Sequence, residues 1–339
     1  MKLSIIVPVY NMGSENKLNH CMDSLVAQTV SDFEILAVND ASTDNSLEIL
    51  RDYEARYPGL VKVITYPDNR RQGGAKNEGL RHAVGEWIGF IDSDDWITPD
   101  YYERLILRAE ETGADIVGCT YSVVNNYTFT PGRVIVNNTP DQTGELDLET
   151  RRKLVSNFSS MVIKVYKASV IKENNLSFPE HIFYEDNCAA PIWAMYFKHF
   201  ELIDEPLYFY YQHSASTVHT VTEDRCRDRL TACEIMLDEL KKRGFYEQYK
   251  TEVEIIFIRT YFINTLFGYM IGCKHPRLSF VRKILAGMLE AFPDFTESRA
   301  FSEIADAEQV KMTKLMLRNT AAFYIYYRAL WCYRNAKKK

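Results

Sequence analysis

The chain has 339 residues, of which 46% are hydrophobic and 25% are charged, and its formal net charge is −6. This length suits one large α/β domain with an appendage, or two domains, and the composition excludes a disordered or fibrous protein. The negative net charge gives no support to nucleic-acid binding as a function. Seven cysteines, an odd number without a CxxC pair, argue against a disulfide framework and against a zinc site.

The two ends of the chain differ in what they predict. No leader precedes the first strand-like run and no apolar stretch of about 18 residues stands out, so we expect a cytoplasmic protein without a transmembrane helix. Residues 311–339 carry eight Lys or Arg and no Asp or Glu, with Met312, Phe323, Tyr327 and Trp331 at near-helical spacing. This pattern fits two alternatives: a peripheral helix at the inner face of an anionic cell membrane, or a terminal helix packed on the protein.

Apolar, β-branched runs alternate with helical patterns in the first part of the chain. Strands are predicted at 3–10, 33–38, 61–66, 86–91 and 115–119, and helical stretches at 15–28, 44–56, 73–84 and 99–112. This alternation predicts an α/β fold with a Rossmann-like, doubly wound, mostly parallel sheet, whose ligands bind beyond the carboxyl ends of the strands. Residues 120–150 predict a loop or hairpin and 151–220 a mixture of helix and short strands, and helical periodicity dominates from about Thr222.

The strongest chemical feature is the sequence DSDD at 92–95, directly after the fourth predicted strand. Mg²⁺ and Mn²⁺ prefer carboxylate oxygens and substrate phosphates, so Asp92 and Asp94 are candidates for a metal site. Alone, this short motif fits an acidic turn before a helix better. Three further polar motifs follow the other strands in order: PVYN at 8–11, NDASTD at 39–44 and GGAKNEG at 73–79.

With these four ordered motifs, residues 1–216 resemble glycosyltransferase family 2, a group of inverting enzymes with the GT-A fold. The resemblance implies a nucleotide-sugar donor, taken here as a UDP-hexose, bound by Pro8, Tyr10, Asn11, Asp40, Lys76, Asp92, Ser93 and His213. It implies Mn²⁺ or Mg²⁺ held by Asp94, Asp92 and His213. The family usually has an Arg where Lys76 stands, and a lysine offers positive charge without a bidentate fork.

The second half of the resemblance supplies a catalytic base. Residues 183–187 read FYEDN and resemble the family's Glu-Asp motif. Inversion by direct displacement needs a carboxylate that takes the proton of the acceptor hydroxyl, and the resemblance gives this role to Asp186, with Glu185 beside it. The alternative is a helix N-cap. His213 also matches the family motif over 207–216, whereas Tyr211 stands where the family usually has Arg.

The predicted function is therefore metal-dependent, inverting transfer of a sugar onto a hydroxyl of a glycan or lipid-linked acceptor in bacterial polysaccharide biosynthesis. The predicted domains are a catalytic GT-A domain, 1–220, and a C-terminal helical region, 221–339. Two alternatives stay open, a nucleotidyltransferase and a non-catalytic sugar- or nucleotide-binding protein. Residues 11–14 are a poor match to the Gly-rich, basic loop of the first, and the replacement of Arg by Tyr211 keeps the second open. The sequence also leaves a homo-oligomer open.

Overall fold

The computed structural model describes residues 1–158, 160–212 and 221–338. The chain divides into two compact units, Met1–Ser214 and Ala215–Lys339. The boundary predicted at residue 220 lies close to this division, in a segment outside the described residues. Each unit is described separately below.

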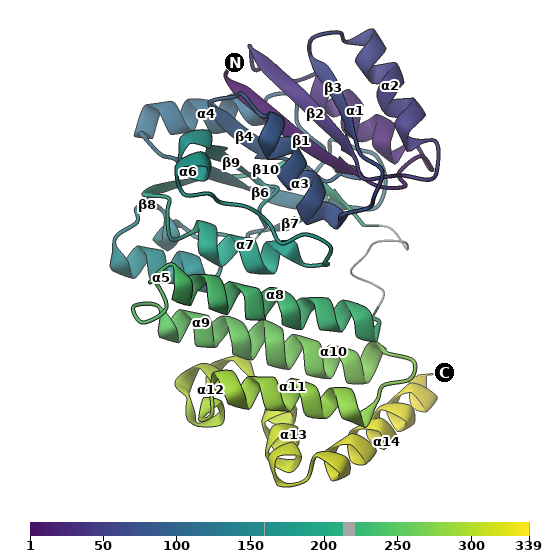
Figure 1. Cartoon of the computed structure of the whole chain (residues 1–339), viewed down its shortest axis with the longest axis vertical. Helices are drawn as coiled ribbons and strands as arrows, with labels where there is room; N and C mark the ends of the chain where they lie inside the picture. The colour runs from purple at the N-terminus through teal and green to yellow at the C-terminus, as the bar shows by residue number, and fades with distance from the viewer. Residues whose placement is uncertain (159, 213–220, 339) are drawn as a thin grey trace. The chain divides into compact units, whose positions relative to one another are not determined.

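A ten-stranded sheet forms the centre of the first unit (Figure 1). Its strands are β1 (Leu3–Val9), β2 (Phe33–Asn39), β3 (Val61–Thr65), β4 (Trp87–Phe90), β5 (Trp96–Ile97), β6 (Ile116–Val124), β7 (Arg133–Ile135), β8 (Gly144–Glu145), β9 (Lys164–Lys167) and β10 (His199–Tyr211). They follow the order β3-β2-β1-β4-β9-β6-β10-β5, with β7 beside β6 and β8 beside β10.

The long strands of this sheet run parallel, as predicted. β3, β2, β1 and β4 pair in parallel, and so do β6 and β10. β9 lies antiparallel between β4 and β6, so those two strands still point the same way. The sheet is therefore doubly wound and mostly parallel, with short antiparallel insertions that the alternating pattern did not predict.

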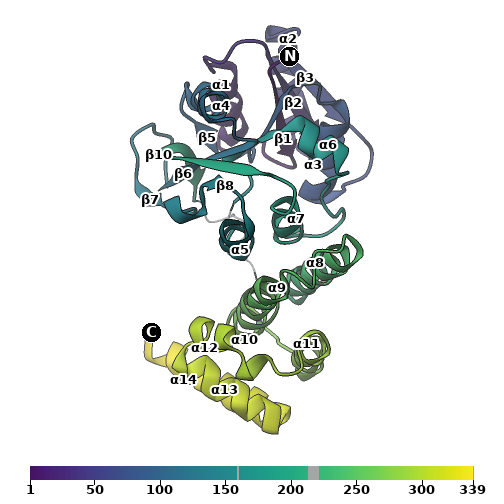
Figure 2. The same ribbon diagram turned by 90° about the vertical axis from the view of Figure 1, so that its left-hand side faces the viewer.

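The described part of the first unit contains seven α-helices. They are α1 (Lys17–Val26), α2 (Ser46–Arg56), α3 (Arg71–His82), α4 (Tyr101–Thr112), α5 (Leu148–Ser156), α6 (Ala168–Glu173) and α7 (Glu185–Trp193), with a short 3₁₀ turn η1 (Pro140–Gln142). Figure 2 shows α1 and α4 on one face of the sheet and α3 and α6 on the other. All seven residues of β1 are consequently buried, which explains its largely apolar sequence.

The middle of the chain settles one open alternative and corrects one prediction. The strand predicted at 115–119 continues to Val124 and returns through β7, so the hairpin of the two alternatives, loop or hairpin, begins the 120–150 region. The segment after 151 was expected to contain only short strands, but β10 has 13 residues. β10 is long because it pairs with β6 along nearly its whole length, an interaction between distant parts of the sequence.

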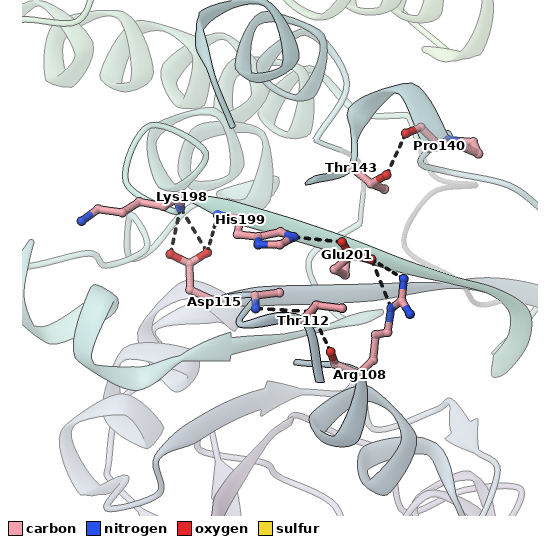
Figure 3. A network of polar contacts seen from close by, with 9 residues as sticks. Arg108, Thr112, Asp115, Pro140, Thr143, Lys198, His199 and Glu201 are labelled. Carbon is pink, nitrogen blue, oxygen red and sulfur yellow. Dashed lines mark hydrogen bonds and ion pairs between the residues drawn. The ribbon is translucent and has the colours of Figure 1, made fainter. Parts of the chain in front are cut away.

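A polar network holds the amino ends of β6 and β10 together (Figure 3). The Asp115 carboxylate accepts hydrogen bonds from the backbone N–H groups of Lys198 and His199, at 2.8 and 3.0 Å. Glu201 contacts the His199 ring at 2.9 Å and accepts from the Arg108 guanidinium at 2.7 Å. The carboxylates of Asp115 and Glu201 at this edge of the sheet therefore each accept hydrogen bonds from N–H groups.

The second unit is helical, as the periodicity from Thr222 predicts. It contains α8 (Glu223–Lys242), α9 (Lys250–Ile256), the π-helix η3 (Phe257–Asn264), α10 (Thr265–Gly272), α11 (Leu278–Ala291), the 3₁₀ turn η4 (Phe295–Glu297), α12 (Arg299–Ile304), α13 (Ala307–Arg318) and α14 (Thr320–Lys338). α9, η3 and α10 form one continuous helix, which packs between α8 and α11.

This continuous helix corrects the expectation that no apolar stretch of about 18 residues occurs in the sequence. Its 23 residues, Lys250–Gly272, are long and apolar enough to cross a membrane, although the sequence suggested no such run. However, 61% of its apolar window is buried inside the protein, as in the core helix of a helical bundle.

The described side chains of residues 311–339, the segment predicted either to lie on a membrane or to pack on the protein, divide into a buried and an exposed set. Met312, Met316, Phe323 and Tyr327 are buried, and the ring of Tyr327 lies 5.5 Å from that of Phe267 on α10. The apolar stripe therefore packs inside the helical unit, which is the second alternative. Ile325 remains exposed on α14, and membrane contact by this region stays a prediction.

Candidate active site

The loops that follow β1 and β2 are joined to each other at the carboxyl edge of the sheet. Asn11 has a left-handed φ of 53°, and its side-chain oxygen accepts a hydrogen bond from the Thr43 N–H at 2.8 Å. The Ser42 hydroxyl accepts from the Asn11 N–H at 3.1 Å. Asn11, predicted to bind the donor, thus builds the loop, whereas its neighbour Tyr10 is exposed and Pro8 is buried within β1.

Asp40 occupies a buried position at the end of β2. Its Oδ1 accepts hydrogen bonds from the Tyr66 hydroxyl at 2.9 Å and from the Arg70 N–H at 2.7 Å. Burial raises the pKa of Asp40, and these two donors partly oppose the rise. The carboxylate is therefore fixed between β2 and the segment that leads into α3, at the place where the resemblance puts the nucleotide base.

Helix α3 approaches the segment before α7 very closely. A Cβ at Gly73 would lie 2.0 Å from the carbonyl oxygen of Pro179, so only glycine fits there. Asn77 fixes the same segment, because its side chain donates to the Phe178 carbonyl at 2.9 Å and accepts from the Phe178 N–H at 2.9 Å. The GGAKNEG motif thus serves contact with residues 178–185, which lie about a hundred positions later in the sequence.

This contact brings together Lys76 and Glu185, two of the predicted site residues. Lys76 Nζ lies 2.6 Å from Glu185 Oε1, and only 3% and 5% of the two side chains are exposed. Burial lowers the pKa of Lys76, but the charges of Glu185 and Asp92 outweigh it and the net shift is upward. Lys76 was predicted to bind the donor, and in the structure its ammonium contacts the Glu185 carboxylate.

Asp92 lies beside this ion pair, directly after β4. Burial raises the pKa of the Asp92 carboxyl to about 7, against the opposing charge of Lys76. The carboxylates of Asp94, Glu185 and Asp186 add to the shift. Four predicted acidic residues, from two distant motifs, therefore lie within electrostatic reach of one another.

Asp186 opens α7 next to Glu185. The residue before the helix, Tyr184, has a left-handed φ of 65°, a conformation that is costly for a non-glycine residue and is often found at functional sites. Asp186 Oδ1 accepts a hydrogen bond from the Asn187 N–H at 2.9 Å. Burial and the neighbouring Glu185 raise the pKa of Asp186, which makes it a stronger base than an ordinary carboxylate.

The structure adds Asp95, which the sequence analysis did not assign. Asp95 is fully buried and accepts hydrogen bonds from the Tyr208 hydroxyl at 2.5 Å and the Tyr211 N–H at 2.8 Å. It therefore ties the acidic motif to the end of β10. Its position in the DSDD run was the available signal, but nothing in the sequence distinguished a buried Asp95 from an exposed one. Ser93 is buried in the same turn.

The acidic cluster suits a divalent cation on chemical grounds. Burial and, after it, repulsion by the neighbouring carboxylates raise the pKa of Asp92, and a bound cation would relieve that repulsion. Within the described ranges, no three His, Cys, Asp or Glu side chains could hold a metal ion by themselves. A metal at Asp94 and Asp92 would take further ligands from donor phosphates and water, as Mg²⁺ commonly does. His213, the third predicted ligand, lies outside the described residues.

Comparison with known proteins agrees with this architecture. The family model for glycosyl transferase family 2 matches residues 4–173. EpsH of Bacillus subtilis is 31% identical over 303 residues, which cover 87% of this chain and 85% of EpsH. The chain belongs to glycosyl transferase family 2, which confirms the family inferred from the four motifs.

Two further relatives extend the comparison. The poly(ribitol-phosphate) beta-glucosyltransferase of Bacillus spizizenii is 37% identical over 184 residues, which cover 54% of this chain but only 27% of that longer protein. The crystal structure of residues 1–349 of Staphylococcus aureus TarS in complex with UDP superposes with a TM-score of 0.68 and 23% identity, over 99% of this chain and 92% of that one. The structural match confirms the predicted GT-A fold.

Proposed function

We propose that the chain transfers a hexose from a UDP-sugar, with inversion, to a hydroxyl group of a polysaccharide or polyol-phosphate acceptor. One observation carries this proposal: Asp186, at the start of α7, lies within electrostatic reach of Asp92, at the end of β4. A proton acceptor is thus held next to the residues that would bind the donor diphosphate. An acceptor hydroxyl between them could be deprotonated as it attacks the sugar carbon.

The other residues of the site have supporting roles in this reaction. Asp40, fixed by Tyr66 and Arg70, would accept a hydrogen bond from the ring N–H of uracil. Lys76 keeps Glu185 in place and so fixes the start of α7, where Asp186 lies. A divalent metal at Asp94 would neutralise the negative charge that develops on the leaving diphosphate. Asp186 would take the proton of the acceptor.

The names of the relatives support the choice of donor and acceptor. TarS has been crystallised with UDP and with UDP-GlcNAc, and it is named as a poly(ribitol-phosphate) beta-N-acetylglucosaminyltransferase. The B. spizizenii relative is also named for a poly(ribitol-phosphate) acceptor. These names make a UDP-sugar donor and a bacterial surface polymer the first candidates for this chain. The cytoplasmic location expected from the sequence stays a prediction.

Calorimetric titration with UDP, GDP and CDP, with Mn²⁺ and then with EDTA, tests the proposal. We expect metal-dependent binding of UDP and much weaker binding of the other two. Asp94→Ala should remove the metal dependence, because the metal loses a ligand. Failure of every nucleotide to bind in the presence of Mn²⁺ would favour a non-catalytic role instead.

A further inference from the structure

A polar cavity of about 520 Å³ lies at the β6–β7 hairpin and the end of β10. Its polar lining consists of three amides, two hydroxyls and one guanidinium, from Asn125, Asn126, Gln212, Thr128, Thr130 and Arg133. Amides and hydroxyls both donate and accept hydrogen bonds, so such a lining suits a ligand that carries many hydroxyl groups.

The charge of the lining narrows the class of ligand further. Residues 116–140 contain no Asp or Glu, and Arg133 is the charged residue among those that line the cavity. This lone cation would tolerate or attract a phosphodiester.

The cavity is connected to the acidic cluster through short contacts. The Gln212 N–H donates to the Val124 carbonyl at 2.8 Å, and the preceding Tyr211 N–H donates to Asp95 at 2.8 Å. On the other side, the indole N–H of Trp96, the residue after Asp95, donates to the Thr128 carbonyl at 2.7 Å. The turn is therefore anchored to the DSDD motif on two sides, and the cavity adjoins the site.

We propose that this cavity is an acceptor subsite, which binds a polyhydroxylated chain beyond the unit that receives the sugar. This inference rests on the proposed transferase function. Two sources share the required chemistry, a neutral glycan and a polyol-phosphate chain. An extended polymer needs such contacts because the carboxylates near Asp186 can hold only the reacting unit.

Binding of two defined probes to the full chain loaded with UDP and Mn²⁺ tests the inference. The probes are a ribitol-phosphate oligomer and a neutral oligosaccharide of glucose, each titrated by calorimetry. Asn126→Ala should weaken binding of whichever probe binds by about tenfold, because one exposed amide is lost. Arg133→Ala should do the same for the phosphate-bearing probe alone. Both residues are exposed, so their substitution should leave folding unchanged.

Lys62→Ala, an exposed cation on β3 at the other end of the sheet, is the matched control and should bind as the wild type does. Loss with Arg133→Ala identifies the polyol-phosphate source, and loss with Asn126→Ala alone identifies the glycan. If UDP binds but neither probe does, or if a probe binds both variants as tightly as the wild type, the subsite is overturned and the transferase function stands. If UDP itself fails to bind, the proposed function fails first.

Discussion

Two acidic side chains at opposite edges of the sheet in the first unit, Glu201 and Asp92, have pKa values shifted in opposite directions. At the amino edge, burial works against ionisation of Glu201, but its hydrogen bonds with His199 and Arg108 lower its pKa below the ordinary range. At the carboxyl edge, burial first and the nearby carboxylates second raise the pKa of Asp92 to about 7, against the opposing charge of Lys76. Paired charges of the first kind stabilise a fold, whereas crowded carboxylates of the second kind cost stability and are typical of functional sites.

The largest expected effect is on catalysis at the carboxyl edge. Asp186→Asn should lower the rate of transfer by about 10²–10⁴-fold, because an amide cannot take the proton from the hydroxyl group of the sugar acceptor. UDP affinity should stay within a few fold. The rate is measured by release of UDP under saturating donor and acceptor. Glu201→Gln, the same type of change at the amino edge, is the control and should keep the wild-type rate; transfer by Asp186→Asn within a few fold of wild type would place the base elsewhere.

The next effect concerns the buried ion pair. Lys76→Met should reduce the free energy of unfolding by about 3–5 kcal/mol, because Glu185 would be left as an unpaired buried charge. Denaturant unfolding of the whole chain measures this loss. The double variant Lys76→Met with Glu185→Leu removes both charges and should recover most of the stability but not the transfer activity. Equal losses in the single and double variants would contradict a stabilising ion pair.

A smaller effect is expected at the amino edge. Asp115→Ala should cost about 1–3 kcal/mol of unfolding free energy, because the backbone N–H groups of Lys198 and His199 lose their acceptor. Donor binding and transfer should not change below the melting temperature. Asp115→Asn keeps one side-chain acceptor and should lose less, and a clear loss of UDP affinity in either variant would show that the two edges are coupled.

The smallest effect is the pH dependence of stability contributed by Glu201. Its pKa is lowered on folding, so it stabilises the folded chain fully above its unfolded pKa and loses this contribution as the pH falls through its folded pKa. Wild type should exceed Glu201→Gln by about 1 kcal/mol at neutral pH, with the difference shrinking in acid. Thermal unfolding of both proteins across this pH range measures the effect, and a difference that grows toward acid would reverse the assigned sign.

Much of the fold and part of the site could be predicted from the sequence. The five strands of the alternating region, their mostly parallel direction and the helical second unit follow from local periodicity. The acidic motifs could be placed at strand ends because parallel strands end at one edge of the sheet. β9 could not be placed in this way, because its position between β4 and β6 depends on pairing with residues far away in the sequence.

The sequence by itself thus determined the residue types at the carboxyl edge and the order of the motifs that bring them there. Only the tertiary structure decided their partners. The tertiary structure pairs the Lys76 ammonium with the Glu185 carboxylate, through a close approach of two segments that requires glycine at position 73. It also buries Asp95, whose carboxylate accepts a hydrogen bond from the Tyr208 hydroxyl. The physical reason is that motif spacing sets which groups can meet, whereas burial and the distances between charges, which set pKa values and ion pairs, exist only in the packed chain.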